Sequence, residues 1–136
     1  MNIQNTFNDF RKQGFRPVEA IRAARILQKW EPLESEGFVK LEWHPDSDPY
    51  DDSFIDTWTD ENENTREQYR KALWRDIERD GVWGLVASIR TDTDDSEAWE
   101  VVDSIWGLVG QDDAGYGPDL MNAAIQELDK KRKTQN

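Results

Sequence analysis

The pattern of apolar and polar residues predicts a β-strand in the first third of the chain. In residues 38–44, FVKLEWH, the apolar side chains Val39, Leu41 and Trp43 occupy every second position, with polar side chains between them. A period of two is typical of a strand that buries one face and exposes the other. We therefore expect this segment to lie in a sheet with one face against the core.

Two further stretches, residues 82–90 (VWGLVASIR) and 98–110 (AWEVVDSIWGLVG), also have the composition of strands. The polar, turn-forming segment 91–97 (TDTDDSE) separates them and favours an antiparallel hairpin. Asp103 interrupts the second strand. It either lies on an otherwise apolar face, as a partly buried carboxylate, or marks a β-bulge, and the pattern leaves both alternatives open.

The helical period of 3.6 residues recurs in four other segments. These are residues 6–13, 16–30, 64–80 and 118–133. We expect Pro32 to break or restart the second helix, because proline has no backbone N–H to donate. The third helix should begin with a capping box formed by Thr65 and Gln68, and should end at Gly81.

These elements follow the order α-α-β-α-β-β-α. Such an order predicts an α+β protein with a single domain over residues 1–136. We expect a small, mostly antiparallel three-stranded sheet with helices packed mainly on one face. The chain contains seven tryptophans, and the apolar stripes that carry most of them place them in the core.

The charge of the chain is unevenly distributed. There are 29 acidic and 17 basic residues, for a net charge of −12. Residues 41–65 hold nine carboxylates and residues 91–129 hold eleven, and neither window contains a lysine or an arginine. The first window includes a long acidic loop at residues 44–64, HPDSDPYDDSFIDTWTDENEN. Concentrated negative charge opposes binding to phosphates and favours a basic partner or a cation.

Several chemistries have no support in the sequence. There is no cysteine, which excludes disulfides and thiol nucleophiles, and His44 is the single histidine, so the usual zinc ligands are missing. The aspartate runs lack the sixth-position glycine and twelfth-position glutamate of an EF-hand loop. No apolar run approaches the ~18 residues of a membrane helix, and the N-terminus lacks a signal-peptide core. We expect a cytoplasmic protein with no cofactor.

Three runs of the chain carry a resemblance: GFRPVEAIRAARILQKWEPLESEGFVKLEWHPDSDPYDDSFIDTW (14–58), ALWRDIERDGVWGLV (72–86) and VVDSIWGLVG (101–110). In these runs the sequence resembles small acidic proteins encoded by phages and other mobile elements. No catalytic signature accompanies the resemblance. By analogy with anti-restriction and anti-CRISPR inhibitors, several of which are DNA mimics, the resemblance implies an inhibitor of a host defence protein.

A rigid body that displays carboxylates at the charge density of a nucleic acid can occupy a basic nucleic-acid-binding groove. We therefore predict a non-enzymatic interaction protein that binds a basic surface of a host protein such as a nuclease, and that binds neither nucleic acid nor membrane directly. The predicted contact residues are Asp46, Asp48, Asp51, Asp52, Asp56, Asp60, Glu61 and Glu63. A second patch at the hairpin tip comprises Asp92, Asp94, Asp95 and Glu97.

Other interpretations remain open. Trp58, inside the acidic loop, is either an apolar anchor for the partner or a pin that holds the loop to the body. A rival function is a small enzyme or ligand-binding domain with a cleft around Asp103 and Arg90. A third possibility is an acidic adaptor that docks without imitating a nucleic acid. The enzyme hypothesis predicts a pocket beside Asp103. The hypothesis of a nucleic-acid mimic predicts ordered carboxylates that internal arginines do not neutralise.

Overall fold

The computed structural model describes residues 2–92 and 98–134 and confirms the α+β class. The elements are α1 (Ile3–Lys12), α2 (Pro17–Ser35), β1 (Val39–Pro45), the 3₁₀ helix η1 (Ser53–Thr57), α3 (Glu63–Asp80), β2 (Val82–Ile89), β3 (Glu100–Val109) and α4 (Gly117–Thr134). The strands form one antiparallel sheet in the order β1-β2-β3. Both the predicted order of helices and strands and the predicted β2–β3 hairpin are confirmed.

Two details of the helices differ from expectation. The N-cap of α3 is Asn62, whose side chain accepts a hydrogen bond from the backbone N–H of Thr65 at 2.8 Å, so the predicted capping box at Thr65 and Gln68 is wrong. Helix α2 continues through Pro32 to Ser35. The proline removes one backbone donor but comes only one turn before the end of the helix, where the loss of one hydrogen bond is tolerated.

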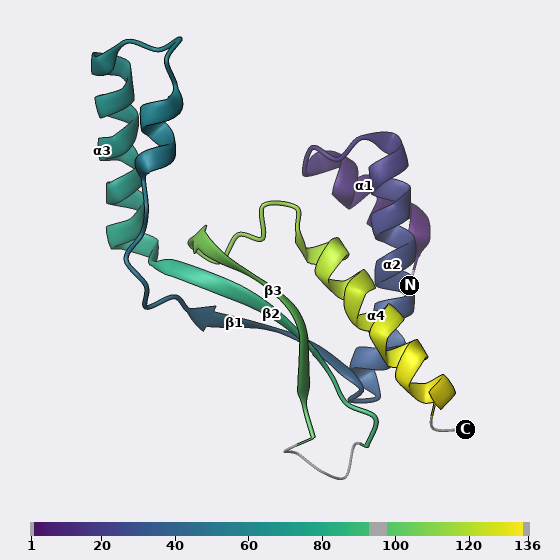
Figure 1. The fold of residues 1–136 in the computed structure, drawn as a ribbon. Helices are drawn as coiled ribbons and strands as arrows, with labels where there is room; N and C mark the ends of the chain where they lie inside the picture. Colours follow the sequence, from purple (N-terminus) through teal and green to yellow (C-terminus); the bar gives the residue numbers. More distant parts are fainter. Residues whose placement is uncertain (1, 93–97, 135–136) are drawn as a thin grey trace.

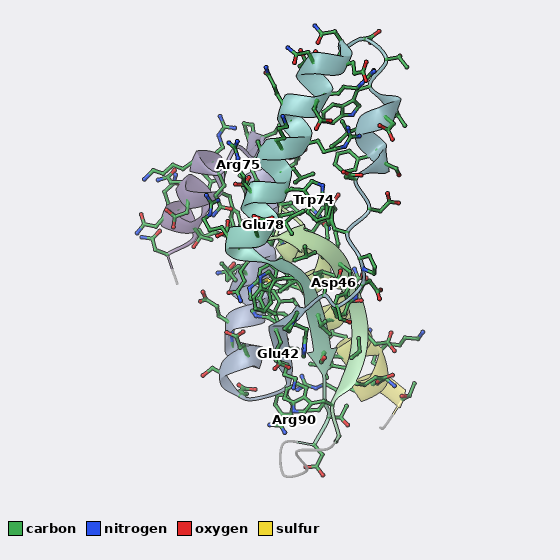
Figure 2. All side chains as sticks on the ribbon, turned by 90° about the vertical axis from the view of Figure 1, so that its left-hand side faces the viewer. Glu42, Asp46, Trp74, Arg75, Glu78 and Arg90 are labelled. Carbon is green, nitrogen blue, oxygen red and sulfur yellow. The ribbon has the colours of Figure 1, made fainter. Side chains whose placement is uncertain are left out.

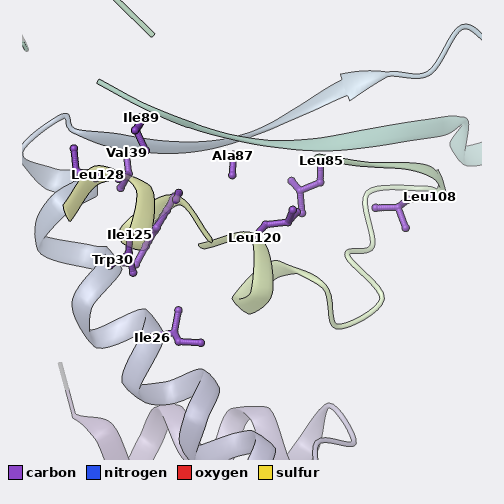
Figure 3. Close-up of a cluster of buried hydrophobic side chains, with 11 residues drawn as sticks. Ile26, Trp30, Val39, Leu85, Ala87, Ile89, Leu108, Leu120, Ile125 and Leu128 are labelled. Carbon is purple, nitrogen blue, oxygen red and sulfur yellow. The ribbon is translucent and has the colours of Figure 1, made fainter. Parts of the chain in front are cut away.

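The hydrophobic core lies between one face of the sheet and helices α2 and α4 (Figures 1 and 3). Its members are Ile26, Trp30, Val39, Leu85, Ala87, Ile89, Leu108, Leu120, Ala124, Ile125 and Leu128. Trp30 is the largest of them and is 1% exposed. The other six tryptophans are half-buried or exposed, so the expectation that most of them belong to the core was wrong.

Helix α3 does not cover the sheet. Figure 1 shows α3 and η1 side by side, projecting from the end of the sheet where β1 ends and β2 begins. We call residues 46–81 the arm. Its base is fixed to the sheet by two backbone hydrogen bonds: Asp46 N–H donates to the carbonyl of Val82 at 2.9 Å, and Gly110 N–H donates to the carbonyl of Gly81 at 2.8 Å.

Strand β3 has a β-bulge beside Asp103. The partner of Asp103 is Ala87, but the residue after Ala87 pairs with Val101, so Val102 is an additional residue in the strand. Asp103 is exposed, and its carboxylate accepts a hydrogen bond from the backbone N–H of Ser104 at 2.9 Å. Of the two alternatives for Asp103, the bulge is confirmed and the buried carboxylate is wrong.

Candidate functional site

The arm concentrates the negative charge of the protein. It carries twelve carboxylates and five basic side chains, for a net charge of −7 out of −12 in about a quarter of the chain. The 18 residues of α3 give it a length of about 27 Å at 1.5 Å per residue. The net density is therefore roughly one charge per 4 Å, close to the ~3.4 Å of a single nucleic-acid strand and less than half that of a duplex.

The acidic loop is folded onto α3 rather than extended into solvent. Ile55 of η1 is fully buried, and η1 lies in contact with α3. In the same segment, Trp58 packs edge-on against Phe54 at 5.8 Å and against Tyr69 of α3 at 4.8 Å between ring centroids. Trp58 is half-buried, and this packing is that of a loop pin. The arm thus has an apolar interior of its own.

Two arginines of α3 hold the loop in place. The guanidinium of Arg70 contacts three carboxylates, with N–O distances of 3.0 Å to Asp52, 2.7 Å to Asp56 and 3.4 Å to Glu67. One turn earlier, Arg66 donates to the backbone carbonyls of Trp58 at 3.0 Å and Glu61 at 3.1 Å. Since Arg66 binds carbonyls, it orders the tip of the arm without neutralising any carboxylate there.

Two other aspartates fix the backbone of the loop. At the base of the arm, Asp46 accepts hydrogen bonds from the N–H of Asp48 at 3.0 Å and the N–H of Gly107 at 3.1 Å, which ties the arm to β3. Figure 2 shows Asp46 at this junction, with Trp74, Arg75 and Glu78 on α3. Asp51 accepts a hydrogen bond from the N–H of Ser53 at 2.9 Å, at the start of η1.

The predicted contact residues therefore fall into two groups. Asp46, Asp51, Asp52 and Asp56 build the arm, and Asp52 and Asp56 are partly neutralised by Arg70. The other four are exposed, and no side-chain ion pair with them is present among the described residues: Asp48, Asp60, Glu61 and Glu63. Three of these surround the tip of the arm, where α3 begins. Glu63 is in the first turn of α3, where the helix dipole favours a negative charge.

The hairpin patch is described only in part. Asp92 is exposed near the end of β2. Asp94, Asp95 and Glu97 lie outside the described residues. The second predicted patch therefore contributes nothing further to the site.

The structure does not bring together the two residues of the rival site. Arg90 donates from Nε to the carbonyl of Gly37 at 2.7 Å and stacks over the ring of Trp99 at 4.4 Å. The small hollow that Arg90 lines includes Glu100 and Lys131 but not Asp103. A cleft was predicted because Asp103 looked partly buried, and the structure shows that Asp103 is exposed.

Trp74 and Arg70 set the ionisation of Asp52. The Trp74 indole N–H, which donates to Asp52 at 2.9 Å, and the Arg70 guanidinium together hold the pKa of the Asp52 carboxyl below its usual range. A depressed pKa in the folded state stabilises the arm at pH values above the pKa of the unfolded chain, about 4. This contribution is lost as the pH falls through the lower, folded-state pKa of Asp52.

We therefore predict that the indole N–H resonance of Trp74 titrates with a midpoint below the ordinary value for aspartate, in an NMR titration of the full chain. The Asp52→Asn variant keeps a side-chain oxygen for the indole but has no carboxyl, so this step should disappear from its titration. A wild-type midpoint at or above the ordinary value for aspartate would contradict the arrangement.

Sequence reasoning missed the stripe on α3 that receives the loop. Arg66, Arg70 and Trp74 recur every four residues and so share one face of the helix. All three donate hydrogen bonds to the acidic loop. The signal was present in the sequence, because two arginines spaced i,i+4 beside an adjacent run of aspartates are suited to bind it.

Comparisons with known protein families, with curated proteins and with solved structures find no match for this chain. Among residues 2–92 and 98–134, three or more potential metal ligands nowhere gather into a cluster that could hold an ion. None of the described helices combines the length and the apolar character needed to cross a bilayer.

Proposed function

We propose that the protein is a non-enzymatic interaction protein, whose arm docks into a basic nucleic-acid-binding groove of another protein, such as a nuclease of a host defence system. The single observation that carries this proposal is the projecting, internally packed arm with a net charge of −7. Its tip presents carboxylates that are exposed and not paired with the arginines of the arm.

The arrangement supports docking in two ways. A folded arm has already lost most of its conformational entropy, so a partner does not have to order it on binding. Exposed carboxylates accelerate association with a positively charged surface by electrostatic steering. Because the net charge density is near that of one strand, a groove that binds single-stranded nucleic acid fits better than one that binds a duplex.

The test begins with capture of a partner. The immobilised full chain is incubated with nuclease-treated host-cell lysate at low salt, and bound proteins are released by a salt gradient. The captured protein is then purified and tested for binding of labelled single-stranded nucleic acid. We expect the wild-type chain to displace that nucleic acid, with an affinity that falls steeply as salt increases.

Two variants with the same net charge locate the interaction. D60N/E61Q/E63Q removes three charges at the tip of the arm, and D9N/E31Q/E36Q removes three exposed charges on α1 and at the end of α2. We expect the tip variant to bind the captured protein about ten-fold more weakly, at 0.2–1 kcal/mol per exposed ion pair. The second variant should bind as the wild type does. Equal losses in both variants would show that only overall charge matters and would refute docking by the arm.

A further inference from the structure

The sheet has a second face that no described helix covers. Helices α2 and α4 pack on one side of the sheet, and Figure 1 shows none across the other side. Cross-strand register places three rows on this side, which we call the open face: Lys40, Ser88 and Val101; Glu42, Val86 and Ser104; His44, Gly84 and Trp106. A sheet face of this kind, with large apolar groups exposed, is typical of an interaction surface.

Trp106 is the main apolar group of the open face. It is 48% exposed, and a Cβ atom added to Gly84 would overlap its six-membered ring, so the indole lies directly over the backbone of β2. The indole N–H donates to the hydroxyl of Ser104 at 3.0 Å, which fixes the ring. Trp106 is therefore an aromatic side chain held in one position with an outer face left exposed.

A shallow apolar hollow lies beside this tryptophan. It has a volume of about 240 Å³ and is lined by His44, Val86, Val101, Ser104 and Trp106. Val101 is 62% exposed at its rim. Trp99 borders the same face, but Lys40 and Arg90 already lie over its ring, each at 4.4 Å from the centroid. The hollow is large enough for one or two aliphatic side chains.

The open face continues directly into the base of the arm. Trp106 precedes Gly107, whose N–H donates to the carboxylate of Asp46, the first residue of the arm. His44, on the rim of the hollow, is two residues before Asp46. A partner that follows the arm toward the body therefore meets the hollow where the arm ends.

We propose that the open face is the apolar part of the docking surface and takes a leucine-like side chain of the basic partner, with Trp106 as its anchor. This inference rests on the proposed function of the arm. An apolar anchor beside a charged surface supplies binding energy that salt does not screen, whereas the arm supplies steering.

Charge and area argue against a second copy as the occupant. Two copies would each bring a net charge of −12 to the contact. Three strands of about eight residues give a face of roughly 400 Å², so that two copies would bury roughly 800 Å² in total, below the ~1,200 Å² of stable interfaces. The same negative charge opposes stacking of nucleic-acid bases on Trp106.

The test uses two labelled basic peptides of about 12 residues, so that the central residues can lie on the open face while one half of the peptide extends along the arm. One alternates lysine and arginine, and the other has leucine at its two central positions. Fluorescence anisotropy at physiological salt measures their binding to the full chain. We expect the wild type to bind the leucine peptide about ten-fold more tightly, despite its lower charge, because a leucine becomes buried.

The Trp106→Ser variant should lose this preference while still binding the lysine–arginine peptide. Tyr116→Ser is the matched control, since Tyr116 is also 48% exposed but lies in the loop before α4, and it should keep the preference. A preference that survives Trp106→Ser would overturn the open face as an anchor and leave docking by the arm intact. Absence of binding by either peptide to the wild type would overturn both proposals.

Two further measurements exclude the other occupants. Sedimentation of the wild type should show a monomer, and a dimer that Trp106→Ser dissociates would overturn a basic protein as the occupant. A labelled single-stranded oligonucleotide should not bind the wild type. Binding of the oligonucleotide that Trp106→Ser abolishes would likewise overturn a basic protein as the occupant. Thermal unfolding of each variant checks that the chain remains folded.

Discussion

Replacing Ile55 with alanine is expected to unfold the arm while the body of the protein stays folded. Ile55 is fully buried, and no residue of α3 is. Loss of a buried isoleucine costs about 2–5 kcal/mol. The other contacts of the arm are made by half-buried or exposed side chains, and a protein helix owes most of its stability to packing rather than to its intrinsic propensity. The variant should therefore lose the order of η1 and fray α3 from its N-terminal end.

Amide hydrogen exchange of the full chain measures this result residue by residue. Amides of η1 and the first turns of α3 should exchange much faster in Ile55→Ala than in the wild type, and amides of β2 should be unchanged. Ile3→Ala is a control, because Ile3 is 38% exposed on α1 and its replacement should leave arm exchange unaffected. Unchanged protection of the arm in Ile55→Ala would show that its apolar interior does not hold it.

Replacing Trp30 with alanine is expected to destabilise the body rather than the arm. Trp30 is 1% exposed and lies among the side chains that α2 and α4 place against the sheet. Truncation of a buried tryptophan costs about 3–5 kcal/mol, and it also removes the hydrogen bond from the indole to Glu34, at 3.1 Å. This is a large fraction of the stability of a typical domain.

Urea unfolding followed by circular dichroism tests this prediction. The midpoint for Trp30→Ala should fall well below that of the wild type, with loss of sheet and helix together. Trp106→Ala is the control, since Trp106 is 48% exposed and its truncation removes fewer contacts. Equal shifts in the two variants would contradict the assignment of Trp30 to the core and Trp106 to an open surface.

The strands were predictable because each has a simple signal. Val39, Leu41 and Trp43 alternate along β1 as expected, and the turn-forming residues between β2 and β3 indicated their hairpin. The face of each residue in β3 was less predictable. The bulge at Val102 reverses the alternation, so that Val102 and Ile105 contact the core while Val101 is 62% exposed. One inserted residue moves the side chains beyond it to the opposite face, so alternation in the sequence alone does not assign their faces.

The arm was predicted only in part. The prolines and carboxylates of residues 44–64 indicated a long loop, and the apolar residues Phe54, Ile55 and Trp58 indicated that part of this loop would pack on the body. They gave no sign that the loop would pack on α3 or that α3 would leave the sheet. Those features depend on contacts between loop and helix, such as that of Arg70 with Asp52 and Asp56. Burial by such distant partners has no local periodicity. The exposure of Asp60, Glu61 and Glu63, in contrast, follows from their polarity alone, and their role in binding stays a prediction.

Like charge in the loop is tolerated because the arm divides its carboxylates between two roles. Asp52 and Asp56 share the guanidinium of Arg70, which offsets part of the repulsion within the loop. The exposed carboxylates at the tip have no such compensation. A basic partner that binds the tip, as the proposed function requires, would relieve the repulsion between these carboxylates.

The most direct test of the account is amide hydrogen exchange in the arm of the unmodified, unbound chain. Docking by the arm requires that the acidic loop is folded before any partner arrives. It predicts slow exchange for the amides of Ile55 and Trp58, which donate to the carbonyls of Asp52 and Ile55. Exchange of both amides at the rate of an unstructured peptide would contradict it, because the carboxylates would then have no fixed arrangement for a partner to recognise.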